Sequence, residues 1–207
     1  MIIDPPQADS KNIYKLMIGA IVPRPIAFVS SLSPDGVRNL APFSFFTPVS
    51  ANPPVVAFCP MVRAGDGRQK DTLHNIEATR EFVVNIVSED FVHEMNECSF
   101  DYPPDGDEFA VSGLTPVASD RVAPPRVKES LFQMECKLLQ VVHVSRQPLG
   151  AGIVIGEVFR FHIDDSLVEN FRIDPDRLRA VGRMGGSTYT RKTERFELPR
   201  PSRQESL

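Results

Sequence analysis

Two stretches decide how this chain folds: PRPIAFVSS at residues 23–31 and NLAPFSFF at residues 39–46. The first reads as a short apolar strand ending in the hydroxyls of Ser30 and Ser31, and a Pro-Asp-Gly turn at 34–36 follows it. The second is rich in small residues and ends in aromatic ones. Together they predict a hairpin at the rim of a β-barrel, with polar groups and main-chain amides facing a flat, phosphate-bearing ligand. Composition alone favours the alternative, in which the phenylalanines are core and the serines are turn formers.

The overall composition favours β-structure in a globular protein. The chain has 207 residues, of which 42% are hydrophobic and 24% charged, as in ordinary globular domains. Its 19 prolines are about twice the average share. They accompany many short apolar runs, which favour strands with irregular loops over a helical bundle. We therefore expect one mainly β domain over residues 1–207, a β-barrel with peripheral helices and a core at about 10–195.

The net charge, the cysteines and histidines, and the lengths of the apolar runs exclude several classes of function. The net charge is −4, which argues against nucleic acid as a partner, because such binding needs a basic face. The three cysteines form no CxxC pair, and we expect free thiols in a reducing compartment. The four histidines form no HExxH pattern, so no metal is expected. No signal-peptide core or 18-residue apolar run is present, so we expect a cytoplasmic protein that makes no membrane contact.

Hydrophobic periodicity and turn residues predict the order of the elements. The expected helices lie at 10–21, 71–80 and 89–97, and the expected strands at 26–32, 37–41, 55–59, 82–87, 131–144 and 152–163. Ser10 is the expected cap of the first helix, whose Leu16 and Met17 recur at helical spacing. Residues 100–130 are polar and rich in proline, and 181–190 are expected to be a loop.

A second candidate site is RAGDGRQKDT at residues 63–72, which leads into the second predicted helix. Free amides and the positive end of a helix dipole attract phosphate, and Lys70 and the Thr72 hydroxyl would add charge and a donor. Asp71 opposes this as the expected N-cap, unless its carboxylate bonds elsewhere. The alternative is a solvated basic loop.

A third segment, GRMGGSTYTR at residues 182–191, lacks the GxGxxG spacing of a dinucleotide-binding turn. Arg183 and Tyr189 could cover a ring, or the segment could be a plain turn. The sequence has no GxSxG and no Cys–His signature. If the protein is an enzyme, the chemistry would then belong to a bound cofactor, and we nominate no catalytic residue.

The ordered set PRPIAFVSS, NLAPFSFF, KDTLHNI and GRMGGSTYTR resembles the flavin reductase-like family of FMN-binding split barrels, in its flavoredoxin-type branch. The resemblance runs from about residue 17 to residue 191. It implies a split β-barrel that binds FMN non-covalently, usually as a homodimer with the flavin near the subunit interface. One departure from the family pattern is Ser31, where many relatives have threonine. Another is the stretched 63–69 loop, which leaves the role of Arg63 open.

By position, the resemblance assigns the flavin contacts. Ser30 and Ser31 would contact the ribityl-phosphate side, and Ala41, Pro42, Phe43 and Ser44 the ring edge. Arg63, Lys70 and Thr72 would hold the phosphate, and Arg183 and Tyr189 would cover the ring or the nicotinamide position. The implied activity is hydride transfer from NAD(P)H to flavin and on to an acceptor, which could be a redox partner protein. The alternative is an FMN-binding electron carrier or flavin-binding module without NAD(P)H reductase activity.

Overall fold

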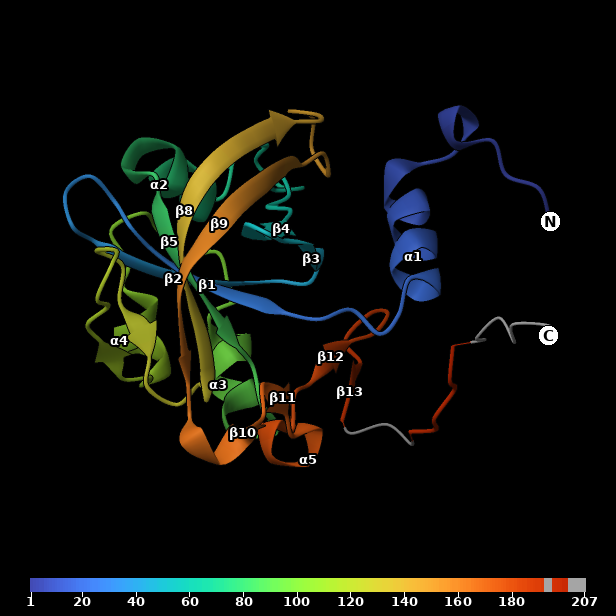
Figure 1. Ribbon diagram of the computed structural model, residues 1–207. Helices are drawn as coiled ribbons and strands as arrows, with labels where there is room; N and C mark the ends of the chain where they lie inside the picture. Colours follow the sequence, from blue (N-terminus) through green and yellow to red (C-terminus); the bar gives the residue numbers. More distant parts are fainter. Residues whose placement is uncertain (192–194, 201–207) are drawn as a thin grey trace, which may run out of the picture.

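The computed structural model describes residues 1–191 and 195–200. Its centre is a seven-stranded antiparallel sheet in the order β2-β1-β5-β8-β9-β4-β3 (Figure 1). The strands are β1 (Ala27–Leu32), β2 (Arg38–Phe43), β3 (Phe46–Ala51), β4 (Pro54–Phe58), β5 (Glu81–Ile86), β8 (Phe132–His143) and β9 (Gly152–Ile163).

The sheet closes on itself, because its two edge strands are neighbours in the sequence. β2 and β3 lie at opposite edges, yet only Ser44 and Phe45 join them. Two residues reach at most about 10 Å, so the two edges must meet. The rings of Phe43 on β2 and Phe58 on β4 lie 5.1 Å apart across this closure. The mainly β barrel predicted from the sequence is confirmed.

β1 is buried on both faces, so its side chains enter two different cores. Successive residues of a strand point to opposite faces. Ala27 and Val29 join the core inside the barrel, with Phe58 and Phe82. Phe28 joins a second core, outside this face of the sheet, that α3 and α4 cover with Met95, Phe109 and other residues.

Some of the helices pack on the barrel: α2 contacts β1, β2 and β8, and α3 and α4 contact β2. The helices of the described residues are α1 (Ser10–Ala20), α2 (Asp71–Thr79), α3 (Val92–Glu97), α4 (Glu108–Ser112) and α5 (Pro175–Leu178), with 3₁₀ turns at Pro5–Gln7, Glu89–Phe91 and Asp165–Leu167. α2 inserts Leu73 and Ile76 into the barrel core. α1 instead stands away from the barrel (Figure 1), and its Leu16 and Met17 remain about half exposed.

The structure corrects three local predictions. Asp9, and not Ser10, caps α1, because its carboxylate accepts a hydrogen bond from the amide of Lys11 at 2.7 Å. The sequence interpretation missed β3, where Pro48 hides the strand pattern; an edge strand tolerates proline. The loop expected at 181–190 contains a short hairpin, formed by β12 (Gly182–Arg183) and β13 (Tyr189–Thr190).

The other two-residue strands of the described residues are β6 (Pro116–Val117), β7 (Arg126–Val127), β10 (Val168–Glu169) and β11 (Arg172–Ile173).

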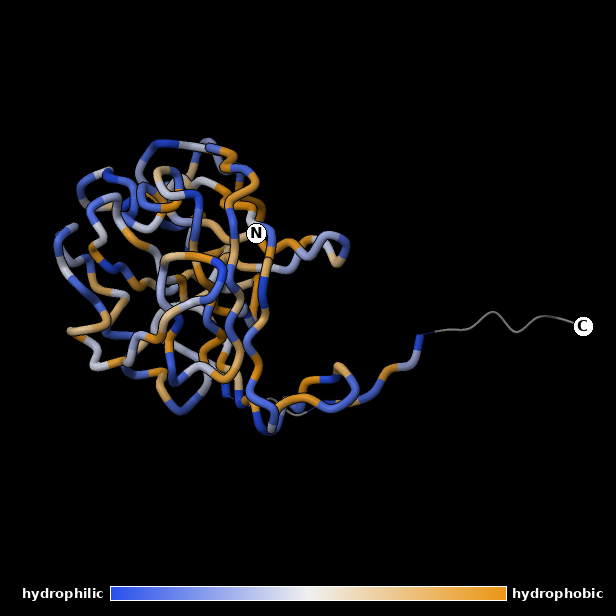
Figure 2. Tube along the Cα trace, turned by 60° about the vertical axis from the view of Figure 1, so that its left-hand side comes forward, coloured by the Kyte–Doolittle hydropathy of each residue, from blue (hydrophilic) through white to orange (hydrophobic). Residues whose placement is uncertain are grey.

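The last described residues contribute little to the core. Residues 196–200 are exposed and lie outside the barrel (Figure 2). The single domain predicted for residues 1–207 stays a prediction, and 192–194 and 201–207 lie outside the described residues. No helix in the described part of the chain has the length and apolar character needed to cross a bilayer.

Candidate functional site

The strand alternation of β1 separates the two serines that the sequence places in one site. The Ser30 hydroxyl donates to the carbonyl of Pro125 at 2.5 Å, on the outer face of the sheet. The Ser31 hydroxyl points to the opposite face, where it donates to Asn39 Oδ1 at 3.3 Å. The structure therefore does not bring Ser30 together with the other predicted site residues, because neighbouring residues of a strand cannot share a face.

Ser31 belongs to a buried polar network that joins β1, β2, α2 and α4. Asn39 Oδ1 also accepts from the Thr72 hydroxyl at 2.6 Å, and Asn75 Nδ2 donates to Ser31 Oγ at 3.2 Å. Glu108 accepts from Asn39 Nδ2 at 2.8 Å and from the Leu40 amide at 3.0 Å. The Thr72 hydroxyl thus donates its proton to Asn39, and the predicted contact of Thr72 with a phosphate stays a prediction.

Sequence reasoning missed three members of this network: Asn39, Asn75 and Glu108. Asn39 and Asn75 could have been found, because both are amides inside motifs that otherwise read as core. Glu108 is only 6% exposed, and burial raises the pKa of its carboxyl to about 7 against the opposing effect of hydrogen bonds from its own amide, the Leu40 amide and Asn39. It lies in the proline-rich 100–130 segment, where no periodic pattern points inward.

Six of the predicted residues line one cavity beside this network. They are Ala41, Pro42, Phe43, Arg63, Lys70 and Thr72. The cavity lies where the start of α2 meets the end of β2. The Leu73 amide donates to the Lys70 carbonyl at 3.0 Å, so the amides of Asp71 and Thr72 are the ones that an anion could reach here.

The start of α2 differs from the prediction in a way that favours anion binding. Lys70, and not Asp71, is the N-cap residue, so Asp71 is the first helical residue. The Asp71 carboxylate accepts from Arg63 Nη2 at 2.9 Å. It therefore bonds away from the helix amides, which is the condition under which the sequence allowed a phosphate.

One of the two cations of this cavity, Arg63, is incompletely satisfied. Arg63 is 9% exposed, and its Nε is buried without a hydrogen-bond partner among the described residues. The nearest anion to Nε is Asp101 Oδ1 at 3.4 Å, which is also paired with Lys70 Nζ. A buried guanidinium nitrogen without an acceptor is costly. Arg63, Lys70 and the α2 amides therefore fit a phosphate group.

The remaining predicted residues lie elsewhere. Arg183 and Tyr189 face each other across β12 and β13, with the guanidinium carbon 4.3 Å from the ring centroid. They line a different cavity, together with Arg179 and Arg191. Ser44 lines neither cavity in the described structure.

Arg24 links Ser44 to the hairpin, a role that sequence reasoning missed although Arg24 is part of PRPIAFVSS. Its Nε lies 3.4 Å from Ser44 Oγ, and its Nη2 donates to the Met184 carbonyl at 2.8 Å. Its Nη1 donates to the carbonyls of Ile18 and Ile21, both at 2.7 Å. A single buried guanidinium therefore positions the end of α1, the β2–β3 link and the hairpin.

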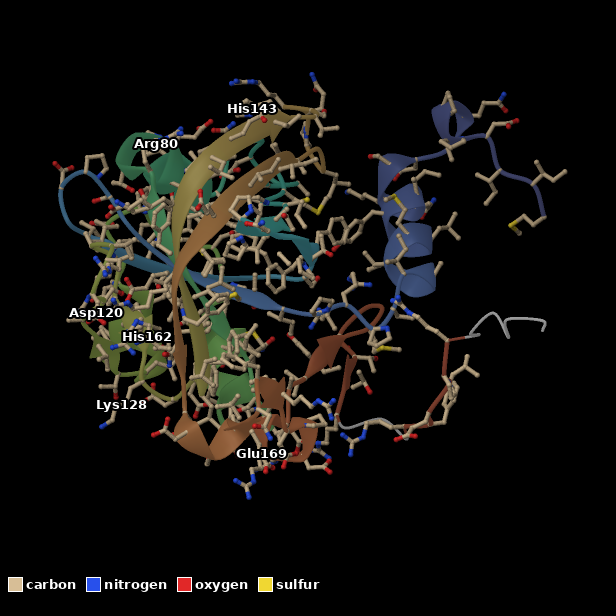
Figure 3. All side chains as sticks on the ribbon, viewed as in Figure 1. Arg80, Asp120, Lys128, His143, His162 and Glu169 are labelled. Carbon is tan, nitrogen blue, oxygen red and sulfur yellow. The ribbon has the colours of Figure 1, made fainter. Side chains whose placement is uncertain are left out.

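A third polar cluster lies on the side of the barrel away from α1 (Figure 3). It contains Asp120, Glu135 and His162, the one group in the described residues with donors close enough for a metal. Glu135 already accepts from His162 at 2.5 Å and from the amides of residues 120 and 121. Arg160 donates to the Asp120 carboxylate at 2.6 Å. With its oxygens engaged and a guanidinium alongside, the cluster tethers the 115–130 loop and offers little to a cation.

The cysteines supply no nucleophile. Cys59, Cys98 and Cys136 are free, and burial raises the pKa of each thiol, that of Cys98 to about 12. All three are therefore neutral near pH 7, and only a thiolate attacks efficiently.

Comparison with known proteins shows similarity over most of the chain. The chain is similar to nitrilotriacetate monooxygenase component B from Bacillus cereus (38% identity, TM-score 0.91, covering 96% of this chain and 98% of that one). It is also similar to 2-nitrobenzoate 2-nitroreductase from Pseudomonas fluorescens (30% identity, TM-score 0.87, covering 100% and 99%). Flavoredoxin of Desulfovibrio vulgaris shares the fold (22% identity, TM-score 0.72, covering 85% and 90%). The family model of the flavin reductase like domain matches residues 18–179, and the chain belongs to that family.

Proposed function

We propose that this protein binds FMN non-covalently and transfers hydride from NAD(P)H to the flavin, which then reduces an acceptor. The observation that carries the proposal is the cavity where Arg63, Lys70 and the start of α2 converge, with a buried Arg63 nitrogen that has no hydrogen-bond partner among the described residues. Family membership and the similarity to a nitroreductase support a flavin-dependent oxidoreductase.

In this proposal Arg63 and Lys70 hold the phosphate, together with the amides at the start of α2. Charge-assisted hydrogen bonds of this kind are about twice as strong as neutral ones. Asp71 draws Arg63 into place and stays out of the way of the anion. Thr72 contributes its main-chain amide, because its hydroxyl is engaged by Asn39.

The ring edge would lie along Ala41, Pro42 and Phe43 of β2. Ala41 and Pro42 are partly exposed, and Phe43 is anchored against Phe58. Small residues let main-chain groups approach a ring closely. Glu108 holds this strand in place, since it accepts from the Leu40 amide and from Asn39 Nδ2.

Arg183 and Tyr189 are proposed to contact the nicotinamide co-substrate. Their cavity is also lined by Arg179 and Arg191, and such cations suit a nucleotide phosphate. The bound flavin would supply the redox chemistry, accepting and giving hydride equivalents. The chain's own residues bind and orient the reactants, and none is assigned as acid or base.

A visible spectrum tests the proposal directly. Purified protein mixed with FMN should hold the flavin through gel filtration, and NADH or NADPH should bleach its absorption. Bound FMN without bleaching would favour an electron carrier or a flavin-binding module. No bound flavin at all would overturn the proposal.

Lys70→Ala should weaken FMN binding by roughly 1.5–3 kcal/mol, because it removes one charge-assisted bond to phosphate. Affinity is measured by fluorescence titration at low salt. Lys128→Ala is the matched control, since Lys128 is exposed and lies far from α2 (Figures 1 and 3). Riboflavin, which lacks the phosphate, should bind the wild type and Lys70→Ala alike. Unchanged FMN affinity in Lys70→Ala would remove this residue from the site.

We propose further that the protein is a homodimer. α1 stands away from the barrel (Figure 1) with Leu16 and Met17 about half exposed, and an isolated apolar helix face needs a covering surface. Light scattering should give about twice the 23.1 kDa mass of one chain. A stable monomer with bound FMN would contradict this.

A further inference from the structure

The segment between α3 and α4 brings a carboxylate into the proposed phosphate site. α3 ends at Glu97 and α4 begins at Glu108, and Asp101 lies in the loop between them. Asp101 Oδ1 pairs with Lys70 Nζ and lies 3.4 Å from Arg63 Nε. One oxygen therefore meets both cations that we assign to the phosphate.

The carboxylates leave no positive charge to spare in this cavity. Two cations, Arg63 and Lys70, face the carboxylates of Asp71 and Asp101, and the Glu108 carboxyl also lines the cavity. A phosphate dianion that entered this arrangement would add negative charge to a cluster that has no net positive charge. Binding the phosphate therefore favours the departure of one carboxylate.

Asp101 is the carboxylate that can leave. Asp71 lies in the first turn of α2, where negative charge is favoured, and it bonds Arg63 at 2.9 Å. The Asp101 side chain is 51% exposed and belongs to a loop, so it can turn into water without becoming a buried unpaired charge. Its contact with Arg63 is not a hydrogen bond, since Arg63 Nε has no hydrogen-bond partner among the described residues.

We propose that Asp101 is a specificity-determining residue, which competes with the ligand phosphate for Lys70 and Arg63. This inference rests on the proposed FMN site. By occupying the cations in the free protein, Asp101 lowers the affinity for phosphorylated flavin and leaves that for riboflavin unchanged. Asp101 therefore lowers the ratio of the FMN affinity to the riboflavin affinity.

Fluorescence titrations of FMN and riboflavin test the proposal on the full chain. Asp101→Asn should tighten FMN binding at least fivefold and change riboflavin binding by less than twofold. Asp101→Ala should do the same, which guards against an effect peculiar to asparagine. Asp66→Asn is the matched control: it removes a negative charge from the neighbouring loop, where Asp66 pairs with Arg68 at 2.6 Å, and should shift neither affinity.

The outcomes separate this inference from the proposed function. A wild type that binds neither flavin overturns both. If the wild type binds FMN, but the Asp101 variants bind it unchanged or more weakly, only the competition is wrong. Equal tightening of FMN and riboflavin, or equal effects of Asp66→Asn and Asp101→Asn on FMN, would also overturn it.

Discussion

Gly156→Ala is expected to destabilise the protein by about 2–3 kcal/mol, although it adds a single methyl group. Gly156 lies in the middle of β9, and a Cβ there would come within 2.3 Å of Phe82 Cζ and 2.7 Å of Cε1. The Phe82 ring is fully buried and packs edge-on against Phe58, with centroids 5.6 Å apart. Because close-packed interiors leave no room for the ring to move aside, the strand or the core must distort. Urea denaturation measures the loss.

Gly152→Ala is the matched control in the same strand. A Cβ at Gly152 would meet its nearest neighbours at 3.5 Å or more, which is ordinary contact, so its stability should stay within about 1 kcal/mol of the wild type. Phe82→Leu should lower the free energy of unfolding less in the Gly156→Ala variant than in the wild type, because the substitution removes the ring that clashes with the new methyl group. Equal stability of the two alanine variants would show that the barrel core adapts more freely than its packing implies.

The barrel could be predicted from the sequence because its strands carry strong local signals. The runs that became β1, β5, β8 and β9 are apolar, β-branched or alternating, and turn residues separate them. β3 could not be predicted, since five of its six residues are exposed and the strand contains Pro48. Its pairing with β4 follows from barrel closure, a long-range property that no local pattern encodes.

The candidate site was predictable where it lies on contiguous motifs and not where it depends on strand direction or on loops. NLAPFSFF and KDT do meet at one cavity. Treating Ser30 and Ser31 as one group ignored the alternation of side chains along a strand, which sends Ser30 to Pro125. Asp101 and Glu108 reach the cavity from an irregular segment, and their positions depend on the packing of Phe109 and its neighbours in the second core.

Glu108 makes the stability of the network depend on pH, and the sign follows from the direction of its pKa shift. Burial raises the pKa of this carboxyl from 4.5 to about 7, so the native state binds more protons than the unfolded state between these values. The free energy of unfolding therefore falls as the pH rises through this window. For a shift of this size the full loss is on the order of 3 kcal/mol, reached above pH 7.

Glu108→Gln isolates this contribution, because glutamine does not titrate. The variant loses one of two hydrogen bonds, since its amide nitrogen must face either the Leu40 amide or Asn39 Nδ2, and this cost is the same at every pH. The advantage of the wild type over Glu108→Gln, measured by urea denaturation, should therefore shrink by about 3 kcal/mol between pH 4.5 and pH 8. Glu97→Gln changes an exposed carboxylate at the end of α3 and should show no such trend.

A constant advantage of the wild type across this pH range would mean that Glu108 stays ionised in the folded protein, because the hydrogen bonds that it accepts outweigh the effect of burial. The polar network of Ser31, Asn39, Thr72, Asn75 and Glu108 would then carry a permanent negative charge at the proposed phosphate site, and Arg63 and Lys70 would have to offset it as well as bind the ligand.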